Sequence, residues 1–345
     1  MAKRDEAGEP VELELAGRTV RVTSPDKVFF TKRSETKLDL VNYYVAVAEP
    51  LMRTMGGRPV LLERYPNGAS GKSFFQKRVP KGAPGWLTTT VVSTPNGTTS
   101  NALVAVDIAH VVWAVNMGCL GFHVWPSLAS DPEHADELRI DLDPSPGVDL
   151  GMIREAARHL KELLDEHGIR SWLKLSGRRG LHIYSRLEPR WDGYAVRLAA
   201  VAVARELERR HPDLITAEWW KELRGERVFV DFNQNAPHKT VFGAWSVRPR
   251  VGASVSMPIR WDQLDELTPD GMTIDVVPGV VEAEGDAWAD YGDDQQDLAP
   301  LLQLHERDRA NGLEDAPWPP VYPKMPHEPP RVAPSRARKP DADED

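Results

Sequence analysis

The stretch LRIDLDPSPG at residues 138–147 decides the fold, because it joins a short apolar strand, Leu138–Leu142, to a Pro- and Gly-rich turn. Its two aspartates, Asp141 and Asp143, are two residues apart. Strand geometry therefore places both side chains on one face of a sheet. Taken alone, an Asp-x-Asp before such a turn is more often part of the turn than a metal site. The elements around it decide between these interpretations.

The chain downstream alternates between helix and strand patterns. Asp149 is placed to cap an amphipathic helix that runs to about His167, and Asp192 to cap a second helix over 194–210. The expected strands are 138–142, 172–175, 181–185 and 228–232. The order β-α-β-β-α-β predicts an α/β (α+β) fold with a ferredoxin-like, or RNA-recognition-motif-like, βαββαβ sheet. In this topology the first strand lies between the third and the fourth.

A third aspartate, Asp231, lies within the last predicted strand, where an unpaired buried charge is costly. The topology brings it beside Asp141 and Asp143. Three converging carboxylates repel one another unless cations neutralise them, and oxygen ligands of this kind suit Mg²⁺ or Mn²⁺. Two such ions can activate a hydroxyl and stabilise an in-line displacement at phosphorus. We therefore predict that these aspartates are catalytic residues that hold two Mn²⁺ or Mg²⁺ ions.

The turn SGRRGLH at residues 176–182 has the groups that a triphosphate needs. Its glycines let backbone amides approach, Ser176 and Arg179 can donate hydrogen bonds, and His182 can contact a charged oxygen. Taken singly, the turn is an ordinary hairpin and His182 a satisfied core histidine. The position beside the carboxylates favours nucleotide binding.

Two further cations, Lys239 and Arg248, follow the third aspartate. Their charge fits the clamping of phosphates, although an ordinary surface loop is the alternative for Lys239.

The composition is that of a globular protein, with 345 residues, 41% apolar and 28% charged. No apolar run approaches the roughly 20 residues that span a bilayer, and the amino terminus has no signal-peptide pattern. The only cysteine, Cys119, excludes an internal disulfide and a multi-cysteine zinc site, and its apolar context predicts a buried side chain. We expect a cytoplasmic, nucleoid-associated protein without a membrane partner.

Charge is distributed unevenly along the chain, although the net charge is −9. Residues 18–81 contain 13 Lys or Arg and 5 Asp or Glu, whereas residues 262–308 contain 1 and 14. A basic amino-terminal third can meet a phosphate backbone while the acidic part stays away from it. Solvated surface charge is the alternative for either block.

Three motifs resemble those of the archaeo-eukaryotic primase superfamily: residues 139–144, the Ser-Gly-x-x-Gly-x-His at 176–182, and residues 229–235. The likeness covers about residues 18–305 and is greatest to the polymerase domain of bacterial DNA ligase D and its stand-alone primase-polymerase relatives. It implies a DNA-dependent nucleotidyltransferase that adds nucleoside triphosphates, preferentially ribonucleotides, to primer 3′ ends. It also implies work at short gaps or broken ends during non-homologous end-joining repair.

The resemblance also assigns residues to the nucleotide. Arg179 stands where a lysine is common in the family, and Gly121 and Val124 depart from the family pattern around His123, which usually has a Glu and a Pro there. The residues implied to contact the nucleotide are His123, Ser176, Arg179, His182, Lys239, Arg248 and Phe75.

Other residues are implied to contact DNA. Lys27 and Lys37 correspond to a grip on a downstream 5′-phosphate, and Phe74, Phe75 and Lys77 to a segment that contacts template and bases. Stacking on aromatic rings tolerates any base. Without the resemblance, the two phenylalanines would be core residues. Arg224 corresponds to an arginine on a loop that shapes the active site.

The resulting domain prediction has four parts. They are a flexible amino terminus (1–17), an αβ module with the 5′-phosphate and template contacts (18–130), a catalytic palm-like module (131–305) and a Pro-rich extended tail with a disordered acidic end (306–345).

Three other functions use parts of the same pattern. The sequence does not distinguish a gap-filling polymerase from a primase that starts chains without a primer, although the phosphate-grip lysines favour gap filling. A non-enzymatic module that binds DNA ends would be expected to lack a metal carboxylate, and a nuclease would not need Ser176, Arg179 and His182. The chain has no Lys-x-Asp-Gly ligase motif, so a separate DNA ligase and a Ku-type end-binding protein are expected partners.

Overall fold

The computed structural model describes residues 8–94 and 97–322. The amino-terminal half contains these elements: β1 (Val11–Leu15), β2 (Arg18–Val22), β3 (Val28–Phe30), β4 (Glu35–Thr36), α1 (Lys37–Ala46), α2 (Ala48–Met55), β5 (Pro59–Arg64), β6 (Phe74–Gln76), β7 (Thr89–Ser93), β8 (Thr99–Val104), α3 (Ile108–Asn116) and β9 (Cys119–Val124).

The carboxy-terminal half contains these elements: β10 (His134–Pro144), α4 (Leu150–Glu166), β11 (Trp172–Leu175), β12 (Leu181–Asp192), α5 (Gly193–Arg210), β13 (Ile215–Thr216), η1 (Lys221–Leu223), β14 (Val228–Asp231), η2 (Phe232–Asn235), β15 (Val241–Phe242), β16 (Pro258–Ile259), η3 (Trp261–Gln263), α6 (Val277–Glu284) and α7 (Ala299–Ala310).

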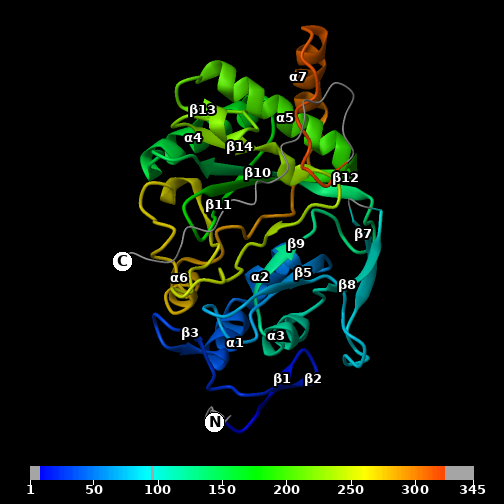
Figure 1. The fold of residues 1–345 in the computed structure, drawn as a ribbon, viewed down its shortest axis with the longest axis vertical. Helices are drawn as coiled ribbons and strands as arrows, with labels where there is room; N and C mark the ends of the chain where they lie inside the picture. Colours follow the sequence, from blue (N-terminus) through cyan, green and yellow to red (C-terminus); the bar gives the residue numbers. More distant parts are fainter. Residues whose placement is uncertain (1–7, 95–96, 323–345) are drawn as a thin grey trace.

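Two larger sheets organise these elements (Figure 1). The first sheet has the order β15-β9-β5-β8-β7, with β6 paired to β5. The second sheet has the order β13-β14-β10-β12-β11-β16. Its central strands follow the predicted topology, because β10 lies between β12 and β14 and is antiparallel to both. The predicted βαββαβ sheet is therefore confirmed.

The second sheet has one apolar and one polar face. Helices α4 and α5 pack on β10, β12 and β14, and both predicted caps form: Asp149 accepts from the Met152 amide and Asp192 from the Ala195 amide. The buried apolar residues of β10, Leu138, Ile140 and Leu142, alternate with polar ones. The polar face is turned away from these helices because strand side chains alternate.

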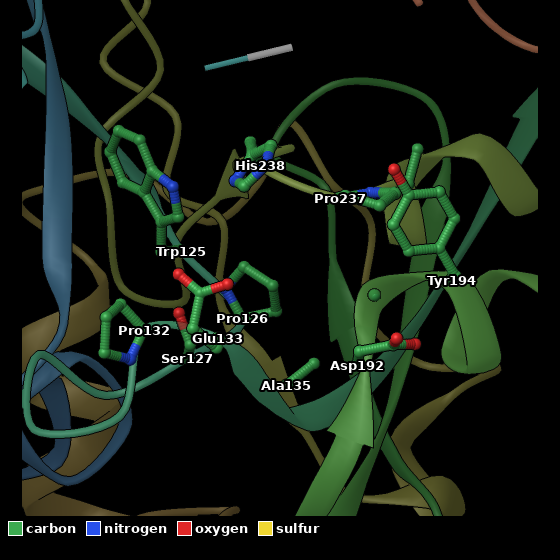
Figure 2. Close-up of a pocket in the computed structure, with 12 residues that line it drawn as sticks. Trp125, Pro126, Ser127, Pro132, Glu133, Ala135, Asp192, Tyr194, Pro237 and His238 are labelled. Atoms are coloured by element: carbon green, nitrogen blue, oxygen red, sulfur yellow. The ribbon is translucent and has the colours of Figure 1, made fainter. Parts of the chain in front are cut away.

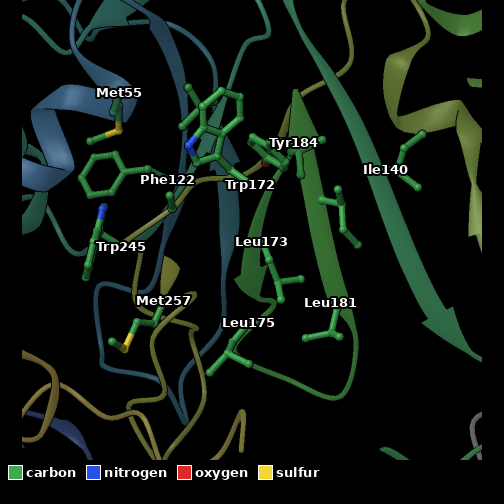
Figure 3. Close-up of a cluster of buried hydrophobic side chains, with 14 of the residues drawn as sticks. Met55, Phe122, Ile140, Trp172, Leu173, Leu175, Leu181, Tyr184, Trp245 and Met257 are labelled. Carbon is green, nitrogen blue, oxygen red and sulfur yellow. The ribbon is translucent and has the colours of Figure 1, made fainter. Parts of the chain in front are cut away.

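A continuous apolar cluster joins the two halves (Figure 3). Met55 and Phe122 come from the first half, Trp172 and Tyr184 from the second sheet, and Trp245 from the chain between β15 and β16. Cys119 is buried in the same cluster, as predicted.

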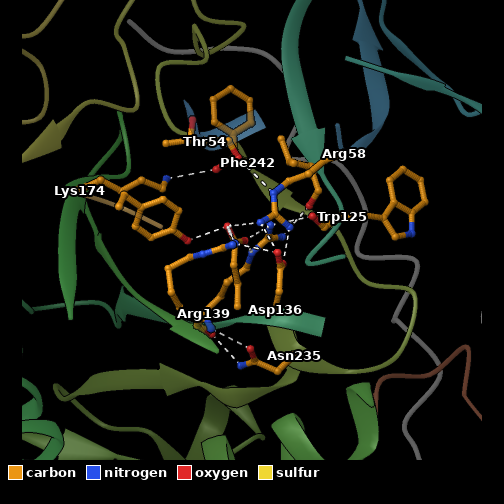
Figure 4. A network of polar contacts seen from close by, with 12 residues as sticks. Thr54, Arg58, Trp125, Asp136, Arg139, Lys174, Asn235 and Phe242 are labelled. Atoms are coloured by element: carbon orange, nitrogen blue, oxygen red, sulfur yellow. Dashed lines mark hydrogen bonds and ion pairs between the residues drawn. The ribbon is translucent and has the colours of Figure 1, made fainter. Parts of the chain in front are cut away.

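A buried ionic network also joins the halves (Figure 4). Arg58, which precedes β5, donates to both oxygens of Asp136, at 2.6 and 2.9 Å, and its side chain lies 3.1 Å from Glu137. Arg139 donates to Glu137 and to the Val124 carbonyl. Burial alone would raise the pKa of Glu137, but the neighbouring guanidinium groups lower it to about 2.

Two parts of the domain prediction need correction. Residues 11–15, predicted to be flexible, form β1, because alternating Val, Glu and Leu residues pair with β2. Residues 306–310, predicted to be extended, continue α7. Residues 1–7 and the predicted disordered acidic end lie outside the described residues. In the described part of the chain, no helix is both long enough and apolar enough to cross a membrane.

Candidate active site

Four charged or titratable side chains form a row across the polar face of the second sheet. Asp141 is paired in register with Asp231 on one side and with His182 on the other, and His182 is paired with Lys174. Register partners on adjacent strands point to the same face. The predicted adjacency of Asp141 and Asp231 is therefore confirmed.

Asp143 lies two residues along β10 on the same face, at the rim of the cleft described below. It is paired in register with Phe229, whose ring lies 3.5 Å from the Arg224 guanidinium carbon. Arg224 is held by the carbonyls of Glu218 and Trp219, at 3.0 and 2.9 Å. The structure thus brings the predicted loop arginine to the aspartates.

The aspartates destabilise one another when all are ionised. Burial, followed by the charges of Asp143 and Asp231, raises the pKa of Asp141 well above its ordinary value. Burial and Asp143 raise the pKa of Asp231 to about 6. The pKa of Asp143 is raised by burial, against the opposing effect of Arg224 and other cations. A bound cation would relieve this repulsion, so the carboxylates fit a divalent metal.

The fit also has a limit. Among the residues the structure describes, no group of three or more His, Cys, Asp or Glu side chains lies close enough together to hold a metal ion as it stands. Mg²⁺ commonly binds through one or two carboxylates and completes its shell with water and substrate phosphates. Asp141, Asp143 and Asp231 suit such a shared site better than a closed protein cage.

A cleft of about 490 Å³ opens beside the aspartates. Of the predicted triphosphate residues, it brings together Ser176, Arg179, His182 and Arg248. The remaining lining residues are Asp141, Asp143, Pro144, Ser145, Pro146, Arg178, Gly180, Lys221 and Arg224. A cleft lined by both cations and carboxylates suits a polyanion bound with a metal.

Arg248 is fixed in this cleft by two contacts. Its Nε donates to the Ser176 carbonyl at 2.5 Å, and its guanidinium carbon lies 3.8 Å from the Phe242 ring centroid. Burial lowers its pKa to about 10, opposed by Asp141 and Glu63, so the group stays charged at neutral pH. Because these contacts fix the plane of the Arg248 guanidinium, its other N–H donors can face a ligand.

His182 is a buried imidazole with unused hydrogen-bonding capacity. Its Nε2 lies 3.4 Å from Asp141 Oδ1, and its Nδ1 is buried without a hydrogen-bond partner in the described structure. Burial lowers its pKa well below the ordinary value, and Lys174 and Arg248 add to this effect. A neutral ring with an unsatisfied nitrogen in a cleft wall fits contact with a ligand.

His123 is oriented by a carboxylate that the sequence did not indicate. Its Nε2 lies 3.0 Å from Glu63 Oε2, and its ring makes edge contacts with Phe75 and Phe242. Glu63 is paired in register with Gly121, where the family usually has a Glu. A Cβ on Gly121 would lie 2.5 Å from the Phe242 ring. The carboxylate thus comes from the neighbouring strand because Phe242 fills the space beside Gly121.

Lys239 does not line the main cleft. With Lys77 it lines a separate pocket of about 270 Å³, next to Trp125 and His238. Its charge nevertheless lowers the pKa of Asp231 against burial, which makes it an electrostatic neighbour of the carboxylate. A smaller cavity of about 130 Å³ adjoins Trp125, His238 and Tyr194 (Figure 2).

The two predicted phosphate-grip lysines lie close together. Lys37 is buried, donates to the Thr23 carbonyl at 2.5 Å, and has its pKa lowered to about 8 by burial and by the charge of Lys27. Lys27 donates to the Pro66 carbonyl and to Asn67. A bound anion would stabilise the charged form of both adjacent amines.

Phe74 and Phe75 are exposed rather than core residues, with 46% and 56% of their surface accessible. Phe74 lies under the Arg64 guanidinium, and Phe75 packs edge-on against His123. Their exposure excludes the core alternative, and the base-contacting role stays a prediction.

The sequence interpretation missed several polar residues around the site: Glu63, Lys174, Arg178 and Lys221. Lys174 could have been found by the argument used for Asp231, because it is a charged residue inside an apolar strand. Gln234, which lies in the third motif, donates to Asp231 Oδ2 at 2.8 Å, a contact that depends on the local path of η2.

Carboxylates on one face of a sheet beside a cationic cleft are typical of sites that transfer nucleotidyl groups. The comparison with protein families agrees with this class. The LigD primase-polymerase domain matches residues 36–288, and the chain belongs to this family.

The relatives are end-joining proteins. The chain is 33% identical over 275 residues to the multifunctional non-homologous end joining DNA repair protein LigD of Mycobacterium tuberculosis, covering 77% of this chain and 36% of that protein. It is 33% identical over 289 residues to the bifunctional LigD of Bacillus subtilis, covering 83% and 46%. The chain therefore spans less than half the length of these curated relatives.

A solved structure has the same fold. The polymerase domain of Mycobacterium tuberculosis ligase D in complex with DNA matches with a TM-score of 0.75 and 31% identity, over 80% of this chain and 99% of that one. The predicted fold class and the predicted family are both confirmed by this match and by the family model.

Proposed function

We propose that this chain is a DNA-dependent nucleotidyltransferase that extends primer 3′ ends at short gaps or broken DNA ends, with a preference for ribonucleotides. The observation that carries the proposal is the in-register pair Asp141 and Asp231 beside the cationic cleft. Membership of the LigD primase-polymerase family and the relatives' role in end joining support it. A separate DNA ligase and a Ku-type protein are proposed partners.

The proposed residues divide the chemistry between them. Asp141, Asp143 and Asp231 would hold two Mn²⁺ or Mg²⁺ ions, which supply a deprotonated 3′-hydroxyl nucleophile and charge neutralisation when bound. Arg248 and Ser176 would bind and orient the triphosphate for in-line attack, since they line the same cleft as Asp141 and Asp143.

Neighbouring groups would complete the site. His182, held neutral, would donate a hydrogen bond to a phosphate oxygen rather than act as a second fixed charge. Arg178, Arg179, Lys221 and Arg224 line the cleft and would stabilise the negative charge that leaves with pyrophosphate.

Primer extension tests the proposal. The purified protein is incubated with a gapped duplex that has a 5′-phosphate on the far side of the gap, Mn²⁺, and either ribo- or deoxynucleotides. We expect addition of a few nucleotides, with ribonucleotides used more readily. Asp231→Ala should abolish extension and leave gap binding, measured by gel shift, largely intact. A wild-type protein that extends no primer with any divalent metal would exclude the polymerase.

The 5′-phosphate contact has its own test. Lys27→Ala combined with Lys37→Ala should remove the difference in binding between gaps with and without a 5′-phosphate, because both amines lie at the proposed site. A matched pair of changes at exposed Lys72 and Lys81 serves as the control for general loss of charge. An unchanged phosphate preference in the first pair would remove these lysines from the site.

A further inference from the structure

The segment that follows α7 folds back onto the second half of the molecule. Residues 314–322, here called the C-terminal strap, run along α5 without regular secondary structure (Figure 1). Arg205 of α5 donates to the Glu314 carbonyl at 2.6 Å. Further along, Trp318 and Tyr322 form an apolar cluster with Ala236, which follows η2. The strap therefore contacts both α5 and the chain that continues from Asp231.

One buried side chain connects the strap to that chain. Arg197 of α5 is fully buried, and its guanidinium carbon lies 3.8 Å from the Trp318 ring centroid and 5.6 Å from that of Phe232. It donates to Asp315 at 2.9 Å and to the Ala316 carbonyl at 2.7 Å. A buried guanidinium is costly unless its donors are satisfied, and the strap satisfies most of them.

Another donor of Arg197 reaches the chain beside the proposed catalytic carboxylate. Its Nε donates to Asn233 Oδ1 at 2.8 Å, while Asn233 Nδ2 donates to the Pro317 carbonyl at 3.0 Å. The backbone amide of the same Asn233 donates to Asp231 Oδ1 at 3.0 Å. Asn233 is thus held by Arg197 and the strap on one side and holds the carboxylate on the other.

The carboxylate has little freedom once these contacts form. Its second oxygen accepts from Gln234 at 2.8 Å, and the same turn is fixed further along, where the Tyr322 hydroxyl donates to the Pro237 carbonyl at 2.5 Å (Pro237 and Tyr194 are seen in Figure 2). Groups that orient a ligand residue in this way set the geometry in which it meets a metal.

We infer that Arg197 is a positioning residue for Asp231 and that the C-terminal strap is a working part of the metal site. The inference rests on the proposed function, in which Asp231 binds a divalent cation. The strap supplies the acceptors that keep Arg197 in place, Arg197 fixes Asn233, and Asn233 aims the carboxylate. Loss of the strap would remove most acceptors of Arg197, leave only its contact with Asn233, and loosen this chain of contacts.

The test measures metal binding directly, without turnover. Mn²⁺ binding is followed by electron paramagnetic resonance for the full chain, for a chain ending at Leu313 that lacks the strap, and for a control ending at Tyr322 that keeps it. We expect the strap-less chain to bind Mn²⁺ about 10- to 100-fold more weakly, the range found when groups that orient metal ligands are removed. The control should bind like the full chain.

Point variants in the full chain keep the test independent of truncation. Arg197→Lys retains the charge but cannot donate to Asn233 and the strap at once, so it should weaken Mn²⁺ binding about tenfold. Arg205→Ala is the matched control, because Arg205 contacts the strap but not Asn233. In primer extension, Arg197→Lys should lower kcat with little change in KM for the nucleotide.

The outcomes separate the two proposals. If the wild-type protein binds no Mn²⁺, the proposed metal-dependent function fails. If the wild type binds Mn²⁺ and both Arg197→Lys and the strap-less chain, folded by circular dichroism, bind it equally well, only the positioning role is overturned. Weakened binding in these variants with unchanged binding in Arg205→Ala supports the inference.

Discussion

Replacing Asp231 by asparagine should stabilise the metal-free protein at alkaline pH. Burial and Asp143 raise the pKa of this carboxyl from 3.8 to about 6. The folded state therefore binds the proton more tightly than the unfolded chain does, and the ionised group destabilises the fold fully above about pH 6. The penalty shrinks as the pH falls through this value and disappears below the unfolded pKa, where both states are protonated.

The size of the effect follows from the shift and from the contacts. A shift of about two pKa units corresponds to about 3 kcal/mol, which partial solvent access reduces. Asparagine keeps an acceptor for the Asn233 amide but loses the charged partner of Gln234, at a cost of about 1 kcal/mol. The net gain expected for Asp231→Asn at pH 8 is therefore about 1 to 2 kcal/mol.

Urea unfolding followed by tryptophan fluorescence measures this gain. In EDTA at pH 8 the variant should be more stable than the wild type, and the difference should be clearly smaller at pH 5. Saturating Mn²⁺ should stabilise the wild type more than the variant, because only the wild type has the complete carboxylate set. Asp213→Asn, at an exposed site, is the control. A variant less stable than the wild type at pH 8 in EDTA would refute the reasoning.

Three further changes test the nucleotide side of the site. Glu63→Gln should weaken nucleotide binding several-fold in a fluorescence titration, because the His123 imidazole loses its charged partner. The free energy of unfolding should change by less than about 1 kcal/mol, since the pair is partly open to solvent. Unaltered nucleotide binding would argue against an orienting role of Glu63. Gly121→Ala should destabilise the protein by about 1 to 3 kcal/mol, since the new methyl group meets Phe242, whereas Gly252→Ala, which meets nothing, should not. Arg248→Lys should raise KM for the nucleotide about tenfold, because lysine loses the planar stacking on Phe242 and the fixed Nε donor to the Ser176 carbonyl. A fall in kcat of about tenfold at constant KM would contradict this.

The sequence predicted the sheet because its local patterns agreed with one another. Capping residues, strand alternation and the two turns specified β10, α4, β12 and α5 and left one common topology. The adjacency of Asp141 and Asp231 then followed from strand order alone. Such arguments work where a side chain's place depends on period and topology.

The features of the site that the sequence did not predict depend on contacts between segments that are far apart in the chain. Glu63 reaches His123 only because β5 and β9 pair in a particular register, and Gly121 leaves room for Phe242 from another strand. The sequence predicted that Lys239 contacts the nucleotide, but the path of its loop places the side chain in a neighbouring pocket and not in the main cleft. Nothing in the sequence indicated the role proposed for Arg197, because the residue lies in a helix with an ordinary amphipathic pattern and its partners in the strap lie more than a hundred residues away.

The buried ionic network between the halves limits how a substrate can enter. A clamshell motion that separated the first sheet from the second would pull Arg58 from Asp136 and Arg139 from the Val124 carbonyl. Stranding buried charges in this way costs several kcal/mol for each broken partnership. We therefore expect a ligand to reach the cleft without separation of the two halves, with movement confined to side chains and loops at its rim.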